Sequence, residues 1–119
     1  MQVSGLVICD SNGLHTEDDW CSPRVQLRVE ANCHATELRV GIWLLADDDP
    51  IGTLVSVTYA GARPVTRALK FDQLSEIVVP VRLQPGDDFS FQVDCEHLIK
   101  NKGEDKRMLS FVMTSLTAV

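Results

Sequence analysis

Apolar and polar residues alternate one by one along much of this chain. The alternation is clearest at positions 24–30, 38–44, 77–83, 89–95 and 109–113. Because successive side chains of a β-strand point to opposite faces, this period of two predicts strands with one buried and one exposed face. The side chains predicted to face the core are Val25, Leu27, Val29, Leu38, Val40, Ile42, Leu44, Ile77, Val79, Val81, Leu83, Phe89, Phe91, Val93, Cys95, Leu109, Phe111 and Met113.

Short segments with turn chemistry separate these runs. Pro, Gly and Asp cluster at 46–52 and 84–88, and the segment 60–64 divides two strand-like runs as a hairpin turn would. No helical period is sustained for three turns, although 95–103 has room for one helical turn. We therefore expect one all-β domain over residues 1–119, an antiparallel, jelly-roll-like β-sandwich of seven to nine strands.

Two strands carry signals about their place in the sheet. Pro80 has no N–H to donate to a neighbouring strand, so its strand is expected to lie at an edge or to contain a bulge. The last run, 107–116, is apolar on both faces, which favours a central position.

The charge balance limits the classes of partner. The net charge is −6 and the isoelectric point is about 4.9. Phosphates need a basic surface, so we expect neither nucleic acid nor an anionic membrane as the main partner, whereas a neutral sugar remains compatible. No apolar run approaches a membrane span and no signal-peptide pattern opens the chain, so a cytoplasmic location is expected.

Neither a catalytic set nor a cofactor motif is present, and we expect no cofactor, no bound metal and no enzymatic activity. Acidic clusters at 17–19, 47–49 and 87–88 leave calcium as an alternative, but they lack the spacing of a calcium loop. We expect the four cysteines to be reduced thiols, with two disulfides as the alternative; they are Cys9, Cys21, Cys33 and Cys95.

The two tryptophans are the first candidates for binding. Trp43 falls on the polar phase of its predicted strand together with Arg39, and Trp20 lies in a loop or at a strand start. An exposed aromatic ring beside charged groups suits a sugar, because the ring stacks on C–H groups while the charges bond the hydroxyls. In the alternative, both rings close the ends of the sandwich core.

Both ends of the chain resemble a known module. The opening stretch 11–29 and the closing stretch 103–119 are similar to a small β-sandwich module appended to bacterial glycosyltransferases and sugar-related methyltransferases. The matching positions are Gly13, Leu14, Glu17, Trp20 and Ser22 in the first stretch, and Asp105, Arg107, Leu109, Ser110 and Phe111 in the second. Asp19 departs from the pattern, because the family has a basic residue before the tryptophan. The resemblance implies sugar binding or docking to a sugar-modifying enzyme.

The charged residues before the last strand have two interpretations. Asp105 and Arg107 are two apart and point the same way on an extended chain. Arg107 either pairs with a carboxylate such as Glu17 and ties the first and last strands together, or contacts a ligand.

These observations predict a non-catalytic module that recognises carbohydrate or docks to a glycan-modifying enzyme. Its candidate ligand-binding residues are Trp20, Glu17, Asp105 and Arg107 at one end of the sandwich, with Trp43 and Arg39 on a sheet face. The alternative is an interaction or assembly module, such as a homodimer, with an open apolar face or an unprotected edge.

Overall fold

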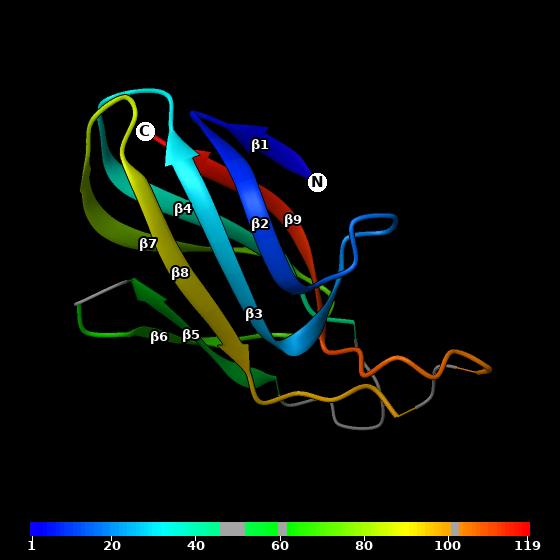
Figure 1. The fold of residues 1–119 in the computed structure, drawn as a ribbon. Helices are drawn as coiled ribbons and strands as arrows, with labels where there is room; N and C mark the ends of the chain where they lie inside the picture. Colours follow the sequence, from blue (N-terminus) through cyan, green and yellow to red (C-terminus); the bar gives the residue numbers. More distant parts are fainter. Residues whose placement is uncertain (46–51, 60–61, 101–102) are drawn as a thin grey trace.

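The protein is an antiparallel β-sandwich, as predicted from its alternating pattern (Figure 1). The computed structural model describes residues 1–45, 52–59, 62–100 and 103–119. Its strands are β1 (Gln2–Ser4), β2 (Leu6–Leu14), β3 (Trp20–Ala31), β4 (Ala35–Trp43), β5 (Thr53–Tyr59), β6 (Val65–Leu69), β7 (Leu74–Leu83), β8 (Asp88–Cys95) and β9 (Phe111–Ala118). Within the described ranges the strand count of nine lies inside the expected range.

The strands form one continuous hydrogen-bonded path that folds into two layers. The order is β6-β5-β8-β3-β9-β4-β7, with β2 added to β3 and β1 added in parallel to β9. Figure 1 shows β2, β3 and β8 in front of β4, β7 and β9. β3 connects the layers, because its first residues pair with β9 and its later residues pair with β8.

The core lies between the two layers. Every side chain predicted to face inward is buried, and all of them except Leu109 join one cluster that both layers share. Val55 and Val57 of β5 and Leu116 of β9 are among the further members of that cluster. Burying an aliphatic side chain of this size stabilises a fold by about 1.5–3 kcal/mol, so the alternating pattern supplies most of the driving force.

The placement of the last strands agrees with the sequence. β9 pairs with β3 on one side and β4 on the other, so it is central as expected. Residues 2–4 run beside residues 115–117, which brings the first and last strands together. β7 ends the strand order, and Pro80 lies opposite Glu37, next to a register shift in β4. The predicted hairpin is also present, as β5 and β6 pair in antiparallel.

The suggested helical turn after β8 does not form in the described residues 96–100. This segment instead runs beside the chain that leads into β9, where the Ile99 N–H donates to the Leu109 carbonyl at 2.8 Å. Ile99 is buried, so this segment also covers its apolar side chain. The Ile99 N–H thus makes a hydrogen bond to a residue ten positions later, where a helical turn would have a local hydrogen bond. The described residues contain no helix long and apolar enough to span a membrane.

Candidate functional site

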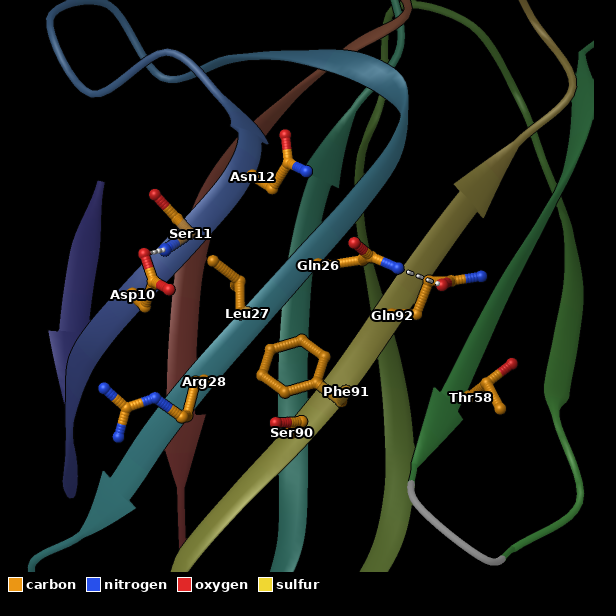
Figure 2. Close-up of a pocket in the computed structure, with 10 residues that line it drawn as sticks. All are labelled: Asp10, Ser11, Asn12, Gln26, Leu27, Arg28, Thr58, Ser90, Phe91 and Gln92. Carbon is orange, nitrogen blue, oxygen red and sulfur yellow. Dashed lines mark hydrogen bonds between the residues drawn. The ribbon is translucent and has the colours of Figure 1, made fainter.

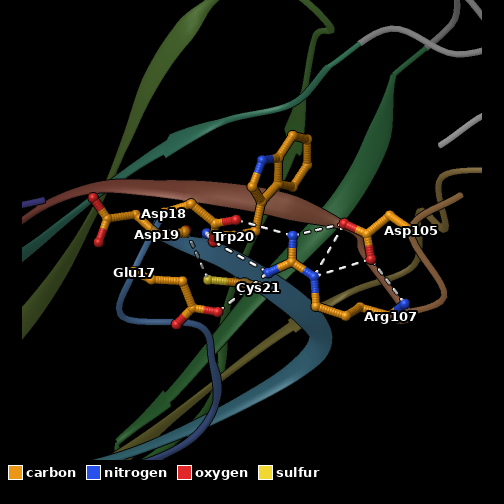
Figure 3. A network of polar contacts seen from close by, with 7 residues as sticks. All are labelled: Glu17, Asp18, Asp19, Trp20, Cys21, Asp105 and Arg107. Atoms are coloured by element: carbon orange, nitrogen blue, oxygen red, sulfur yellow. Dashed lines mark hydrogen bonds and ion pairs between the residues drawn. The ribbon is translucent and has the colours of Figure 1, made fainter. Parts of the chain in front are cut away.

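Arg107 holds three carboxylates at one end of the sandwich (Figure 3). Its Nη2 atom is 2.7 Å from Asp105 Oδ2 and 2.9 Å from Asp18 Oδ2. Its Nε atom donates to both oxygens of Asp105, and its Nη1 atom lies 3.6 Å from Glu17 Oε1. The network joins the loop between β2 and β3 to the segment before β9.

The ion pairs shape the electrostatics of this loop. The hydrogen bond from Arg107 holds the pKa of the Asp18 carboxyl below its ordinary value, and the carboxylates raise the pKa of Arg107. Because the guanidinium N–H groups already point at carboxylates, few donors remain for a ligand. The arrangement is the clasp that the sequence suggested, with Glu17 as an outer partner and Asp18 as a nearer one.

Asp19, directly before β3, contacts other parts of the chain through its side chain and its backbone. It has a positive φ of 62°, a conformation that Asp tolerates better than most residues. Its carboxylate pairs with the N-terminal ammonium of Met1, and its carbonyl accepts from the Met113 N–H at 3.1 Å. The Asp19 backbone therefore links the start of β3 to β9.

Trp20 starts β3 next to the clasp, but its ring belongs to another surface. Figure 3 shows the indole extending away from the Arg107 guanidinium and from the carboxylates around it. The backbone of Trp20 lies opposite Val112 of β9. Direct partners on neighbouring strands point to the same face, so the half-buried Trp20 side chain shares the outer face of β9.

Trp43 lies on that same outer face. It stands opposite Val112 on one side and opposite Leu74 of β7 on the other. Trp20, Val112, Trp43 and Leu74 therefore form a row across β3, β9, β4 and β7, which we call the tryptophan row. Its two rings start from Cα atoms two strand spacings apart, about 10 Å. Trp43 is 41% exposed, so it does not close the end of the core.

Polar groups adjoin the tryptophan row along β4. A Cβ atom on Gly41 would come within 2.2 Å of Ser115 Oγ and 2.6 Å of Thr114 Oγ1, so these hydroxyls cover the glycine. Further along the strand, Arg39 donates through Nε and Nη2 to one oxygen of Glu37, at 3.0 and 2.9 Å. Both members of this pair are partly exposed, and each retains polar atoms that face solvent.

The outer face also has an apolar border at β7. Leu74 is 70% exposed and Val78 is 38% exposed, two positions on either side of Glu76. In the described part of the chain β7 pairs with β4 alone, although it also contacts β6. Leu74 and Val78 are therefore exposed apolar side chains at the end of the strand order.

A groove whose lining residues are mostly polar lies on the other layer, and the sequence did not single it out (Figure 2). It has a volume of about 560 Å³ and crosses β2, β3, β8 and β5. Its lining residues are Asp10, Ser11, Asn12, Gln26, Leu27, Arg28, Thr58, Ser90, Phe91 and Gln92. The alternation correctly placed Gln26, Arg28, Ser90 and Gln92 on outward faces. It could not show that those faces adjoin.

The acidic, histidine and cysteine side chains are the candidates for metal binding and for thiol reactivity. Among them no group of three or more His, Cys, Asp or Glu side chains could hold a metal ion. The acidic cluster 47–49 lies outside the described residues. All four cysteines are free thiols; Cys21 and Cys95 are buried, and burial raises the pKa of Cys21 to about 12.

No protein-family model and no curated protein matches the chain. A solved structure of exo-β-1,3-galactanase from Phanerochaete chrysosporium with galactose overlaps it with a TM-score of 0.43 and 10% identity, over 90% of this chain and 24% of that one. A variant of the same enzyme with β-1,3-galactotriose gives 0.45 and 12% identity, over 91% and 25%. This chain thus spans about a quarter of the length of those structures.

Proposed function

We propose that the protein is a non-catalytic carbohydrate-recognition module and that the tryptophan row is its binding surface. The observation that most supports this proposal is the pair of outward-facing rings, Trp20 and Trp43. Both residues lie opposite Val112, one on each side of β9. Two rings at this spacing offer a sugar chain two stacking positions, each favourable through contact between C–H groups and the ring face.

The polar groups beside the rings suit the hydroxyls of such a chain. The half-buried Ser115 hydroxyl lies next to Trp43, across from Gly41. Arg39 and Glu37 offer a donor and an acceptor that are bonded to each other, about 13 Å and about 20 Å from Trp43 along the strand. Since the pair is internally neutral, it favours an uncharged ligand, in agreement with the acidic net charge of −6.

The test is calorimetric titration of the full chain with neutral trisaccharides. We expect Trp43→Ala to weaken binding by about tenfold or more, because stacking of one ring is worth roughly 1–2 kcal/mol. Met108→Ala is the control, since Met108 is also a large exposed apolar side chain but lies outside the row. Equal affinity of the two variants would refute the role of the tryptophan row.

A second function is favoured by the apolar border of the same face. Leu74 and Val78 would add apolar area to a docking surface for a sugar-modifying enzyme or for a second copy of the chain. The resemblance of both chain ends to modules fused to bacterial glycosyltransferases supports the enzyme-docking form.

Val78→Lys separates the two functions, because Val78 belongs to the apolar border but lies outside the tryptophan row. A charge at this exposed edge position opposes burial in a protein interface, yet leaves the rings in place. If the face binds sugar, the variant keeps its trisaccharide affinity. If the face mediates assembly, sedimentation equilibrium shows self-association of the wild type at high concentration, and the variant loses it.

A further inference from the structure

The groove of Figure 2 is built from two parallel rows of polar side chains. In the longer row the backbone partners are Asn12 and Gln26, then Gln26 and Gln92, then Gln92 and Thr58. This row crosses four strands, which corresponds to three strand spacings, or about 14 Å. Polar groups therefore extend over a length greater than one sugar ring.

The shorter row lies two residues further along the strands. Asp10 stands opposite Arg28, and Arg28 stands opposite Ser90. Ser90 ends this row and has a shorter side chain than Arg28 beside it. The volume of about 560 Å³ falls inside the range of about 300–1,000 Å³ that is usual for ligand sites.

A relay of hydrogen bonds orders the groove floor. The Gln26 side-chain amide donates to the Gln92 carbonyl oxygen at 3.0 Å, and the Gln92 amide donates to Asp94 Oδ2 at 2.7 Å. Arg24 Nε closes the relay by donating to the other oxygen of Asp94 at 2.8 Å. The relay fixes which way each amide points, and it does not use the Gln26 carbonyl oxygen or the second N–H of each amide.

Other groups that line the groove have hydrogen-bonding capacity to spare. In the described part of the chain, the side chains of Asn12, Thr58 and Ser90 make no hydrogen bond to another protein group. Together with the ordered amides they offer both donors and acceptors, as a ligand with many hydroxyls requires.

The two arginines in and around the groove are each paired with an aspartate. Arg28 Nη1 lies 3.1 Å from Asp88 Oδ2, and Arg24 is paired with Asp94. Asp10 adds a negative charge at the wall, where its Oδ1 accepts the Ser11 N–H at 2.9 Å. With its cations paired and one further carboxylate present, the groove attracts no anion, so a neutral ligand suits it better than an acidic one.

We propose that this groove is a second binding site, for a neutral oligosaccharide held edge-on by hydrogen bonds without aromatic stacking. It is independent of the tryptophan row, which lies on the outer face of the other layer. A sugar chain across the strands would exchange hydrogen bonds with the row from Asn12 to Thr58, over the ordered amides of Gln26 and Gln92. The proposal thus makes the module able to engage glycan on both outer faces.

The test follows the side-chain amide signals of Gln26 and Gln92 by NMR while the full chain is titrated with cellotriose, maltotriose and laminaritriose. At least one of these neutral probes is expected to shift both amides in a saturable way at millimolar concentration. Trigalacturonate, the acidic comparison, is expected to shift them far less. If none of the three neutral probes shifts these amides, the groove is not a glycan site.

A matched pair of variants separates binding from stability. Gln26→Met keeps the length of the side chain but removes its polar atoms, and we expect about tenfold weaker binding from the loss of hydrogen bonds. Glu30→Met places the same side chain on the same face of β3, outside the groove lining, and is expected to bind as the wild type does. Equal affinity in both variants would overturn the proposal.

The same titration distinguishes this proposal from the tryptophan row. Trp43→Ala is expected to leave the Gln26 and Gln92 shifts unchanged, and Gln26→Met to leave the indole shifts unchanged. If the indole signals respond and the amide signals do not, the groove proposal fails alone. If the reverse holds, the proposal for the tryptophan row fails alone.

Discussion

Trp20 and Trp43 lie on either side of Val112 of β9 and both stand directly opposite it. In the sequence, 22 positions lie between the two tryptophans. The relationship depends on β3, which leaves the front layer at its first residues to pair with β9. The two rings that the sequence assigned to separate sites therefore share one surface. The clasp around Arg107 secures the corner at which this happens.

The two tryptophans should differ in their effect on stability. Trp43→Ala removes a side chain that is 41% exposed, so the free energy of unfolding should fall by less than about 1 kcal/mol. Trp20→Ala removes a half-buried ring at the corner between layers and should cost about 2–3 kcal/mol. Urea denaturation of both variants measures the difference; an equal loss would contradict the assignment of Trp43 to the exposed face.

Gly41 should be intolerant of any side chain. A methyl group there would meet Ser115 Oγ at 2.2 Å and Thr114 Oγ1 at 2.6 Å, so the hydroxyls or the strand must move. We expect Gly41→Ala to destabilise the protein by about 1–3 kcal/mol, the usual cost of overpacking. Thermal unfolding gives the result. An unchanged midpoint would show that the hydroxyls turn away freely and that the surface beside Trp43 is not ordered.

The clasp should make stability depend on acid. The folded pKa of Asp18 is lowered from 3.8 by Arg107, so the clasp is at full strength above that ordinary value. As the pH falls further, through the lowered folded pKa, the carboxylate takes up a proton and this stabilisation is lost. Arg107→Gln should therefore lower the unfolding temperature at neutral pH but much less in strong acid.

The control for the clasp is Arg82→Gln, which removes the same charge from an exposed position of β7. Its effect should be small and similar at both pH values. A loss of stability for Arg107→Gln that is the same at neutral and acidic pH would mean that the guanidinium acts through packing and not through Asp18.

The cysteines should react in order of their exposure. Cys9 is exposed, whereas burial raises the pKa of Cys21 to about 12 and also raises the pKa of Cys95. Only the thiolate attacks a disulfide reagent, so Cys9 should react quickly at neutral pH, and Cys21 and Cys95 only after denaturant is added. Rapid labelling of Cys21 in the native protein would contradict its place in the core.

The alternating pattern predicted the core because strand geometry is local. Whether Leu27 or Gln26 faces inward is decided by the pleat of β3, and hydrophobic residues mark the buried side. Two other predictions also rested on local features. The missing N–H of Pro80 predicted an edge or a bulge, and the two apolar faces of the last strand predicted a central position.

The candidate sites depend on which strands adjoin and in what register, and neither is a local property. The sequence placed Trp20 beside Arg107 because their segments meet, but the ring direction follows from pairing with Val112. The groove needed three long-range pairings to bring Asn12, Gln26, Gln92 and Thr58 into one row. Asp18, adjacent to the predicted Glu17, became the nearer partner of Arg107 through the turn that precedes β3.

The most direct test of the account follows the two indole N–H signals by NMR during titration with neutral trisaccharides. If Trp20 and Trp43 form one binding surface, both signals shift with the same dissociation constant, and Trp43→Ala raises the dissociation constant that the Trp20 signal reports. Indole signals that stay in place for every probe, or a Trp20 dissociation constant that is unchanged by the loss of Trp43, would contradict it.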